Sequence, residues 1–159
     1  MCVRTRPAQD ARHDAVVNAI WAYLTRKGYQ VYREKCFRDQ EGKRWIPDLV
    51  LWKPGVPKAY CLDVGVAYEL ASDSLGRTES IKREKYSCVQ SEMEQFVRNN
   101  SFMSGATLQR YGLIFGSRGS IHNVCLNLLK ELEFSNAQIE RLLESVTDAT
   151  MRIYRDFRA

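Results

Sequence analysis

The sequence lacks any long hydrophobic run. Across its 159 residues, no apolar stretch approaches the roughly 20 residues that a helix needs to cross a bilayer. The first ten residues are partly basic, but no apolar segment of the signal-peptide type follows them. We therefore expect a soluble protein with no membrane among its partners.

Paired cysteines and nucleotide-binding loops are also missing. The five cysteines are an odd number and include no Cys-x-x-Cys pair. Cys61 and Cys125 lie in apolar runs, where a small buried thiol is the ordinary interpretation. This pattern predicts a reducing, intracellular compartment. No glycine-rich loop joins a strand to a helix, which disfavours a nucleotide-binding α/β enzyme.

The overall composition is that of a globular domain. Hydrophobic residues make up 45% of the chain and charged residues 27%, enough for one compact domain with a core, so residues 1–159 are expected to form a single domain. Lys and Arg number 24 against 19 Asp and Glu, a formal charge of +5. This balance favours a polyanionic partner, although an ordinary basic surface would have the same composition.

Hydrophobic spacing and turn residues predict an α/β fold. Asp10 is expected to cap a first helix that Gly28 ends. Strands are expected at 29–37, 45–52 and 59–68, then a helix from about 80 to 99 and a strand at 110–115. Helices near 123–134 and from 135 onward follow, the last one opened by a capping box at Ser135 and Gln138. The predicted order is α-β-β-β-α-β-α-α, with a mixed central sheet flanked by helices.

Two neighbouring strands each carry one acid. Asp48 lies in Ile46-Pro47-Asp48-Leu49-Val50-Leu51, and fourteen residues separate it from Asp63 in the apolar run 59–66. A carboxylate inside an apolar run is costly unless its charge is compensated, and a metal ion shared by two acids is a common compensation. The pair therefore predicts a Mg²⁺ site, although a strand aspartate can also pair simply with an arginine.

This order of elements, with an acid on the second and third strands, resembles the core of the PD-(D/E)XK restriction-like nuclease superfamily. Four motifs sharpen the resemblance: Arg12-His13-Asp14, Pro47-Asp48-Leu49-Val50, Asp63-Val64-Gly65-Val66 and Lys82-x-x-Lys85-Tyr86. Together they are similar to the restriction-like endonuclease domain of site-specific non-LTR retrotransposons. The similarity runs from about residue 2 to residue 86, and the tail matches only in its strand-then-helix layout.

The resemblance implies a nuclear, Mg²⁺-dependent DNA endonuclease, with Mn²⁺ as a possible substitute, that nicks target DNA for target-primed reverse transcription. It also implies a parent polyprotein with a reverse transcriptase upstream. A zinc knuckle precedes the nuclease in such proteins, and Cys2 resembles its trailing edge. On that interpretation residue 1 is a truncated start. A natural short protein would have the same sequence.

The lysine of the superfamily motif is displaced in this sequence. Many members carry it two residues past the third-strand acid, where this chain has Gly65. The retrotransposon group takes its lysine from the following helix, which offers Lys82 and Lys85 here. We expect Asp48 and Asp63 to bind metal, Lys82 to assist the chemistry directly and Lys85 to contact phosphate. The alternative is that both lysine stems pack on the protein and the ammonium groups stay in water.

Other residues are weaker candidates. Tyr86, Arg12 and Asp14 are expected to support the site, and His13 is a possible phosphate contact or acid/base group. Glu34, Glu69 and, more weakly, Asp73 are possible additional acids at the site. The Gly-Ser turn 116–120 ahead of His122 is a possible phosphate contact. Backbone contacts to DNA are predicted for five basic residues: Lys43, Arg44, Arg77, Arg83 and Arg118.

A noncatalytic nucleic-acid-binding domain that keeps the nuclease fold is the competing hypothesis. A domain selected only for binding would gain from basic residues at Asp48 and Asp63, because two uncompensated carboxylates repel phosphate. The two acids therefore favour the nuclease.

Overall fold

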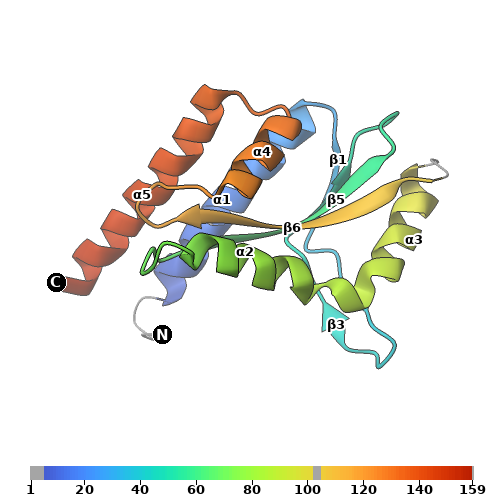
Figure 1. Ribbon diagram of the computed structural model, residues 1–159, viewed down its shortest axis with the longest axis horizontal. Coiled ribbons are helices and arrows are strands. Elements are labelled where there is room, and N and C mark those ends of the chain that lie inside the picture. The colour runs from blue at the N-terminus through green and yellow to red at the C-terminus, as the bar shows by residue number, and fades with distance from the viewer. Residues whose placement is uncertain (1–5, 102–104, 159) are drawn as a thin grey trace. The chain divides into compact units, whose positions relative to one another are not determined.

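The computed structural model describes residues 6–101 and 105–158 and has a mixed α/β architecture (Figure 1). The elements are α1 (Arg6–Arg26), β1 (Gln30–Arg33), β2 (Phe37–Arg38), β3 (Arg44–Trp45), β4 (Leu49–Trp52), β5 (Lys58–Ala67), α2 (Ser74–Lys85), the 3₁₀ turn η2 (Ser87–Val89), α3 (Gln90–Ser101), β6 (Thr107–Gly116), α4 (Asn123–Glu131) and α5 (Asn136–Arg158). The predicted order of helices and strands is confirmed, with three of the predicted elements subdivided. Cys2, the expected zinc-knuckle remnant, lies outside the described residues.

The main sheet has four strands in the order β1-β4-β5-β6, and β2 and β3 form a separate antiparallel pair. β4 is antiparallel to both β1 and β5. The amide of Thr107 donates to the carbonyl of Pro57, and the amide of Ser117 donates to that of Ala67. The start of β6 is thus bonded beside the start of β5 and its end beside the end of β5, so these two strands are parallel. The predicted mixed sheet is therefore confirmed.

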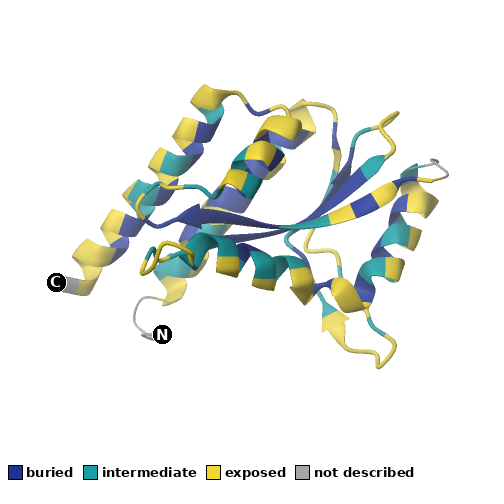
Figure 2. Ribbon diagram, in the orientation of Figure 1, coloured by how far each residue is buried: buried dark blue, intermediate teal, exposed yellow. Residues whose placement is uncertain are grey.

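The chain divides into two compact units. One comprises the described residues of 1–20, 64–78 and 113–159, and the other comprises residues 21–63 and 79–112. Four long elements, α1, β5, α2 and β6, contribute residues to both units. Burial along β6 changes accordingly: its first five residues are partly or fully exposed except Leu108, and its last five are buried (Figure 2).

The core of the second unit lies on one face of β4 and β5. Alternate residues on these strands point to the same face. The cluster contains Phe37, Val50, Trp52, Ala59, Cys61, Tyr86, Val89, Met93, Val97, Ala106 and Leu108. Phe96 of α3 packs edge-on against both Tyr32 and Trp52, with ring centroids 4.9 and 6.1 Å away. Tyr86, Val89, Met93 and Phe96, which recur at spacings of three, four and three in the sequence, thus face the sheet.

The first unit is built on helical hydrophobic faces. Val16, Val17 and Ile20 of α1 are buried, as are Ile139 and Val146 of α5. The predicted capping box at the start of α5 is confirmed. The amide of Ser135 donates to Gln138 Oε1 at 2.8 Å, and the amide of Gln138 donates to Ser135 Oγ at 3.3 Å.

Several predicted boundaries are wrong for local reasons. α1 begins at Arg6, so Asp10 lies inside the helix and is not its cap. The predicted strand 29–37 is interrupted at Glu34, which has a left-handed φ of 48°. The strand at 45–52 is interrupted at 46–48, where Pro47 has no amide to donate. The helix at 80–99 instead begins at Ser74 and breaks after Lys85 into η2 and α3. Gly28, with φ 84°, ends α1 as predicted.

Two expectations from the amino-acid composition can be compared with the described residues. None of the helices there combines the length and the apolar character that crossing a membrane requires. None of the four cysteines in the described part of the chain forms a disulfide.

Candidate active site

Asp63 is a buried carboxylate near the end of the second unit's core. It lies on β5 with a side chain only 4% exposed. Ala59 and Cys61, at alternate positions before it, belong to the hydrophobic cluster. Strand periodicity therefore directs Asp63 to the same face, one step beyond the apolar cluster. A carboxylate in this position needs partners that offset its lost hydration.

Two lysines of α2 supply those partners. Lys82 Nζ lies 2.8 Å from Asp63 Oδ2, and Lys85 Nζ lies 3.5 Å from the same oxygen. The Lys82 side chain is 26% exposed and that of Lys85 is 45% exposed. Lys82 is thus both closer and better shielded, which gives its charge the stronger effect on Asp63. Both ammonium groups lie at the carboxylate, where a displaced motif lysine is expected.

Tyr86 donates a hydrogen bond to the other carboxylate oxygen of Asp63, Oδ1. Its hydroxyl lies 3.1 Å from Asp63 Oδ1 and 3.0 Å from the carbonyl oxygen of Ile46, and donates toward both acceptors. The ring is buried and packs edge-on against Trp45. Lys85 Nζ also lies 4.7 Å from the centroid of this ring. Tyr86 therefore fixes the carboxylate orientation and joins it to the segment that leads to Asp48.

Asp48 lies immediately before β4, partly buried. Leu49 pairs with Leu62 in the antiparallel ladder, so Asp48 and Asp63 are the next residue on each strand beyond that pair. Asp48 also has the same strand parity as Val50 and Trp52, which face the core. The backbone thus directs the two acids to one face of neighbouring segments.

The charges of Asp48 and Asp63 both raise the pKa values of the same two neighbours, Tyr86 and Cys61. The pKa of the Tyr86 hydroxyl is raised, mainly by burial, next by the Asp63 charge and then by the Asp48 charge. The pKa of the Cys61 thiol is raised to about 12, mainly by burial, with contributions from both aspartates and an opposing one from Arg110. Negative potential from the two acids therefore reaches the same buried groups, a setting in which a cation is favoured.

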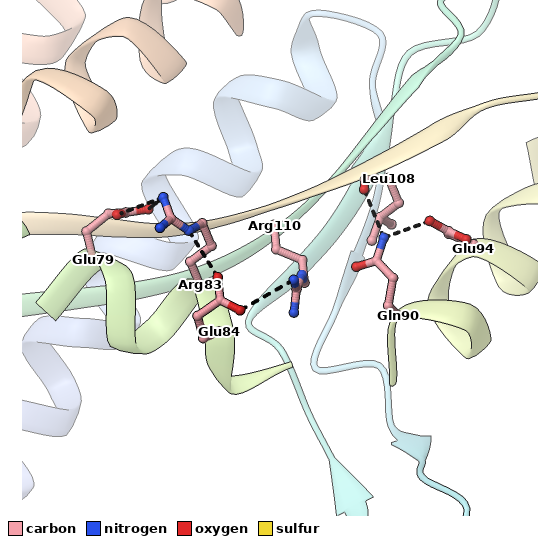
Figure 3. Close-up of polar contacts among 7 residues, drawn as sticks. All are labelled: Glu79, Arg83, Glu84, Gln90, Glu94, Leu108 and Arg110. Carbon is pink, nitrogen blue, oxygen red and sulfur yellow. Dashed lines mark hydrogen bonds and ion pairs between the residues drawn. The ribbon is translucent and has the colours of Figure 1, made fainter. Parts of the chain in front are cut away.

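The position of α2 depends on a glycine in β6. A β-carbon at Gly112 would lie 2.6 Å from the Glu79 carbonyl oxygen and 2.9 Å from Lys82 Cβ. Only a residue without a side chain permits this approach, which brings the Lys82 turn of α2 against the strand. The same turn has an ion-pair network in which Arg83 joins Glu79 to Glu84, and Glu84 meets Arg110 (Figure 3).

The Arg-His-Asp motif of α1 lies in the first unit and makes its own contacts there. Arg12 is buried and donates from Nη1 to Thr150 Oγ1 at 2.7 Å, joining α1 to α5. Burial lowers the pKa of its guanidinium. His13 Nδ1 lies 3.2 Å from Asp14 Oδ1. These contacts explain a structural role for Arg12, and support of the catalytic site remains a prediction.

The additional acids make other contacts. Glu34 is exposed, and its amide donates to the Asp48 carbonyl at 3.1 Å. β5 ends at Ala67, two residues before Glu69, so strand alternation does not direct Glu69 to the face of Asp63. Its carboxylate instead accepts from the Arg118 amide at 2.9 Å and from the Ser117 and Ser120 hydroxyls. Asp73 pairs with Arg77 at 2.6 Å.

This arrangement also accounts for the turn at 116–120. The Arg118 amide belongs to the turn named above as a possible phosphate contact, and it donates instead to a carboxylate of the protein itself, that of Glu69. The His122 ring packs near Gly76, and its buried Nδ1 has no hydrogen-bond partner among the described residues. A phosphate contact by the side chain of Arg118, which is exposed, stays a prediction.

The basic residues predicted to bind DNA differ in their availability. Lys43 is exposed with its ammonium 4.3 Å from the Trp45 ring centroid, and Arg44 donates to Cys36 Sγ. Arg77 is paired with Asp73, the residue before α2, and Arg83 is paired with Glu79 of α2. Lys43 and Arg44 are therefore better placed than Arg83 to bind the phosphates of DNA.

Sequence reasoning missed several residues of this region. Glu79, a buried acid, and Arg110 belong to the ion-pair network beside Lys82. Gly112 was also missed, although a glycine inside a strand is a known sign of close backbone approach.

Among the described residues, no group of three or more His, Cys, Asp or Glu side chains gathers as a ready-made metal site. Two carboxylates are nevertheless a sufficient protein contribution for Mg²⁺, which takes its remaining ligands from water and substrate phosphate. Comparison of the chain with protein-family models and with curated proteins gives no match in either case.

Proposed function

We propose that this chain is a Mg²⁺-dependent DNA endonuclease that nicks target DNA, as in the retrotransposon nucleases that its motifs resemble. The observation that carries the proposal is the buried Asp63 carboxylate with two lysines at 2.8 and 3.5 Å, on a strand next to the Pro47-Asp48 segment. An acid pair with a lysine beside it is the residue set that metal-assisted phosphodiester hydrolysis uses.

The acids fit the proposed ion. Asp48 and Asp63 provide hard anionic oxygens, the ligand type that Mg²⁺ and Mn²⁺ prefer. When bound, a divalent cation neutralises phosphate oxygens and makes water a nucleophile near neutral pH. Asp48 and Asp63 are the residues that would hold it.

The protein's own groups have separate roles in this proposal. Lys82 places a positive charge beside Asp63, where it can donate a hydrogen bond to a nonbridging phosphate oxygen as negative charge develops there. Lys85, more exposed, contacts the phosphate of bound DNA. Tyr86 keeps Asp63 oriented, because its hydroxyl also donates toward the Ile46 carbonyl. Water adds to phosphorus and gives up a proton to bulk solvent, the P–O bond to the leaving oxygen breaks, and that oxygen takes a proton from bulk solvent.

One observation favours the noncatalytic alternative. Both oxygens of Asp63 already have partners, Lys82 and Lys85 on one and Tyr86 on the other. A carboxylate satisfied in this way can be purely structural. In that case the domain binds nucleic acid without cutting it.

A nicking assay separates the two functions. Supercoiled plasmid is incubated with the purified chain in Mg²⁺, in Mn²⁺, and in EDTA. We expect conversion to open circles only with the cations. Plasmid retarded on a gel but never nicked, at any cation concentration, would leave the noncatalytic function standing. The proposal includes the parent polyprotein with its reverse transcriptase and zinc knuckle, and a nuclear location.

A further inference from the structure

The β2–β3 hairpin has two faces of different character. Its strands pair Phe37 with Trp45 and Arg38 with Arg44. Phe37 is buried in the core cluster, and the partly buried Trp45 packs edge-on against Tyr86. Neighbouring residues of a strand point to opposite faces, so Arg38 and Arg44 lie together on the outward face, where both are exposed. In Figure 1 the hairpin, labelled at β3, extends past the lower end of α3.

The two arginines form a cross-strand pair of like charge. Residues directly opposite each other in a sheet have their β-carbons about 4.5–5.5 Å apart, and like charges there are destabilising. Arg38 Nη1 donates to the Gly42 carbonyl at 2.8 Å, and Arg44 Nε donates to Cys36 Sγ at 3.3 Å. Neither acceptor is a carboxylate. Each bond uses one of the five N–H donors of a guanidinium, so most donors of the pair remain available to a ligand.

The acids of the hairpin do not neutralise this pair. Asp39 Oδ1 accepts from the amides of Glu41 and Lys43, and Asp39 Oδ2 accepts from Trp45 Nε1 at 2.7 Å. The Asp39 carboxylate thus closes the turn and binds the tryptophan of the inward face. Glu41 is exposed in the turn, and in the described part of the chain no ion pair joins it to either arginine. The outward face therefore keeps two positive charges.

The hairpin is held at both ends by the candidate active site. Before it, the Glu34 amide donates to the Asp48 carbonyl at 3.1 Å. After it, the Ile46 carbonyl accepts from the Tyr86 hydroxyl at 3.0 Å. The outward face is consequently a preformed surface, fixed in position relative to Asp48 and Tyr86. A surface of this kind loses little conformational entropy when a ligand binds.

The unused groups select an anionic ligand. Two guanidinium groups offer several N–H donors and no acceptor, and this arrangement matches an oxyanion with more than one acceptor oxygen. A backbone phosphate of DNA has that chemistry, and arginine is well suited to it because its planar donors bind two oxygens at once. DNA is favoured over an acidic protein segment because the hairpin is anchored to the acids proposed to act on DNA.

We propose that Arg38 and Arg44 together hold one backbone phosphate of the DNA that enters the active site. The inference rests on the DNA binding of the proposed function but not on its metal chemistry. Arg38 was not among the residues expected to contact DNA, and Arg44 was expected to act alone. The shared phosphate gives the like-charged pair the anion that the described protein groups do not supply.

The test measures how DNA binding depends on salt. A short, fluorescently labelled DNA duplex binds the whole chain in EDTA, and anisotropy gives the affinity over a range of salt concentrations. The logarithm of the affinity falls with the logarithm of salt concentration by about 0.9 for each phosphate contacted. We expect Arg38→Gln/Arg44→Gln to bind at least about tenfold more weakly and to lower this slope by about 0.9. An unchanged slope would overturn the inference. A slope lowered by about 1.8 would mean two separate phosphates and would overturn the shared contact.

Two further double variants serve as controls. Arg38→Lys/Arg44→Lys keeps both charges and should retain the wild-type slope while binding more weakly, because lysine lacks the planar donors. A role of the arginines only in hairpin structure would not tie the slope to their charge. Arg26→Gln/Arg141→Gln removes the same charge from exposed arginines of α1 and α5, and Arg141 also donates to a carbonyl. It should leave the slope unchanged, and an equal loss there would overturn the inference.

Folding and ligand class are checked in the same experiment. Circular dichroism confirms folding, and if the hairpin double variant is unfolded, Arg38→Gln and Arg44→Gln decide singly, each with weaker binding expected. Unchanged affinity in both would overturn the inference. Unlabelled duplex should displace the labelled duplex, and polyglutamate of equal charge should not. Equal displacement by polyglutamate would assign the pair to an acidic protein segment and overturn the DNA contact.

The outcomes also separate this inference from the nuclease proposal. A chain that nicks plasmid but keeps its salt slope in the hairpin double variant retains the nuclease function and loses the shared contact. A chain that nicks nothing but loses slope with the arginine pair has the contact and lacks the nuclease function. A wild-type chain that does not bind the duplex rejects the contact, whatever the plasmid assay shows.

Discussion

Asp63 and Glu69 are two acids six positions apart, one inside β5 and one two residues beyond its end, and they are satisfied in different ways. Asp63 is met by two ammonium groups and a phenol. Glu69 is met by a backbone amide and two hydroxyls from the turn at 117–120. The first set includes two cations carried on long side chains, whereas the second is wholly neutral and close to the backbone.

On the proposed function, this difference separates a functional carboxylate, Asp63, from a structural one, Glu69. Lysine ammonium groups can move and can be replaced by another cation or by a substrate contact. Neutral donors from a short turn have no such alternative, so Glu69 serves to hold the turn. Mutations that act on one acid and not on the other test whether this interpretation is right.

The largest effect is expected from removing the charge of Asp63. Asp63→Asn should lower Mg²⁺-dependent nicking by roughly 10³-fold, because the metal site loses a charged ligand. Binding of DNA without cation should be kept or improved, because repulsion of phosphate decreases. Asp48→Asn should behave in the same way.

Glu69→Gln is the matched control for that variant. It should nick plasmid within about threefold of wild type, since its partners all come from the turn. Equal activity losses in the two variants, or none in either, would remove the distinction between the acids.

The next largest effect separates the two lysines. Lys82→Ala should reduce the nicking rate at saturating DNA by about a hundredfold, the usual scale for lost acid/base or electrostatic assistance. Lys85→Ala should mainly weaken DNA binding, because Lys85 is the more distant and more exposed of the two. Single-turnover rates over a range of DNA concentrations provide the measurement, with Lys130→Ala on α4 as a control. Equal effects on rate from both lysines would contradict the assignment.

A smaller effect is expected at Gly112, which sets the distance between α2 and β6. In Gly112→Ala the new β-carbon meets a backbone carbonyl at 2.6 Å, so α2 must move. We expect the free energy of unfolding to fall by about 1–3 kcal/mol and nicking to fall with it. Urea unfolding and the plasmid assay measure the two quantities.

Gly76→Ala, on α2 itself, tests whether adding a methyl group at another glycine has the same effect as adding one at Gly112 of β6. Its β-carbon would lie 3.2 Å from the His122 side chain, which is able to shift, and alanine favours a helix by up to about 1 kcal/mol. Stability should stay the same or rise. A loss as large as that of Gly112→Ala would mean that the close approach at Gly112 is not special.

The smallest expected effect is on the stability of the Glu69 turn. Glu69→Gln keeps one acceptor oxygen but loses the charge that strengthens its hydrogen bonds, so the free energy of unfolding should fall by about 1 kcal/mol. Thermal unfolding measures it. A fall above about 3 kcal/mol would show that Glu69 does more than hold a turn.

Part of this site could be predicted because its signals are local. Asp48 and Asp63 stand out as charges inside apolar runs, and strand alternation directs them to one face. Lys82 and Lys85 begin a helical stripe that becomes apolar, which indicates an inward position. The capping box and Gly28 follow from short-range hydrogen bonding and backbone freedom.

The remainder depends on tertiary packing. The break after Lys85 places the Tyr86 hydroxyl at Asp63 and the Ile46 carbonyl, and no local propensity contains those distant partners. The partners of Glu69 could not be predicted, because they lie nearly 50 residues later in the chain.

Asp63 and its lysines are far apart in the sequence, so the site forms only in the folded protein. The acid and the two ammonium donors are 19 and 22 positions apart, so they meet only after α2 has docked. In the common superfamily pattern the two groups are neighbours on one strand and would be together even in a partly folded chain. If the proposed nuclease function holds, catalytic activity requires native packing here, and local opening of α2 would abolish the activity before the whole protein unfolds. Damage to DNA by nascent or misfolded copies would be avoided without any inhibitor.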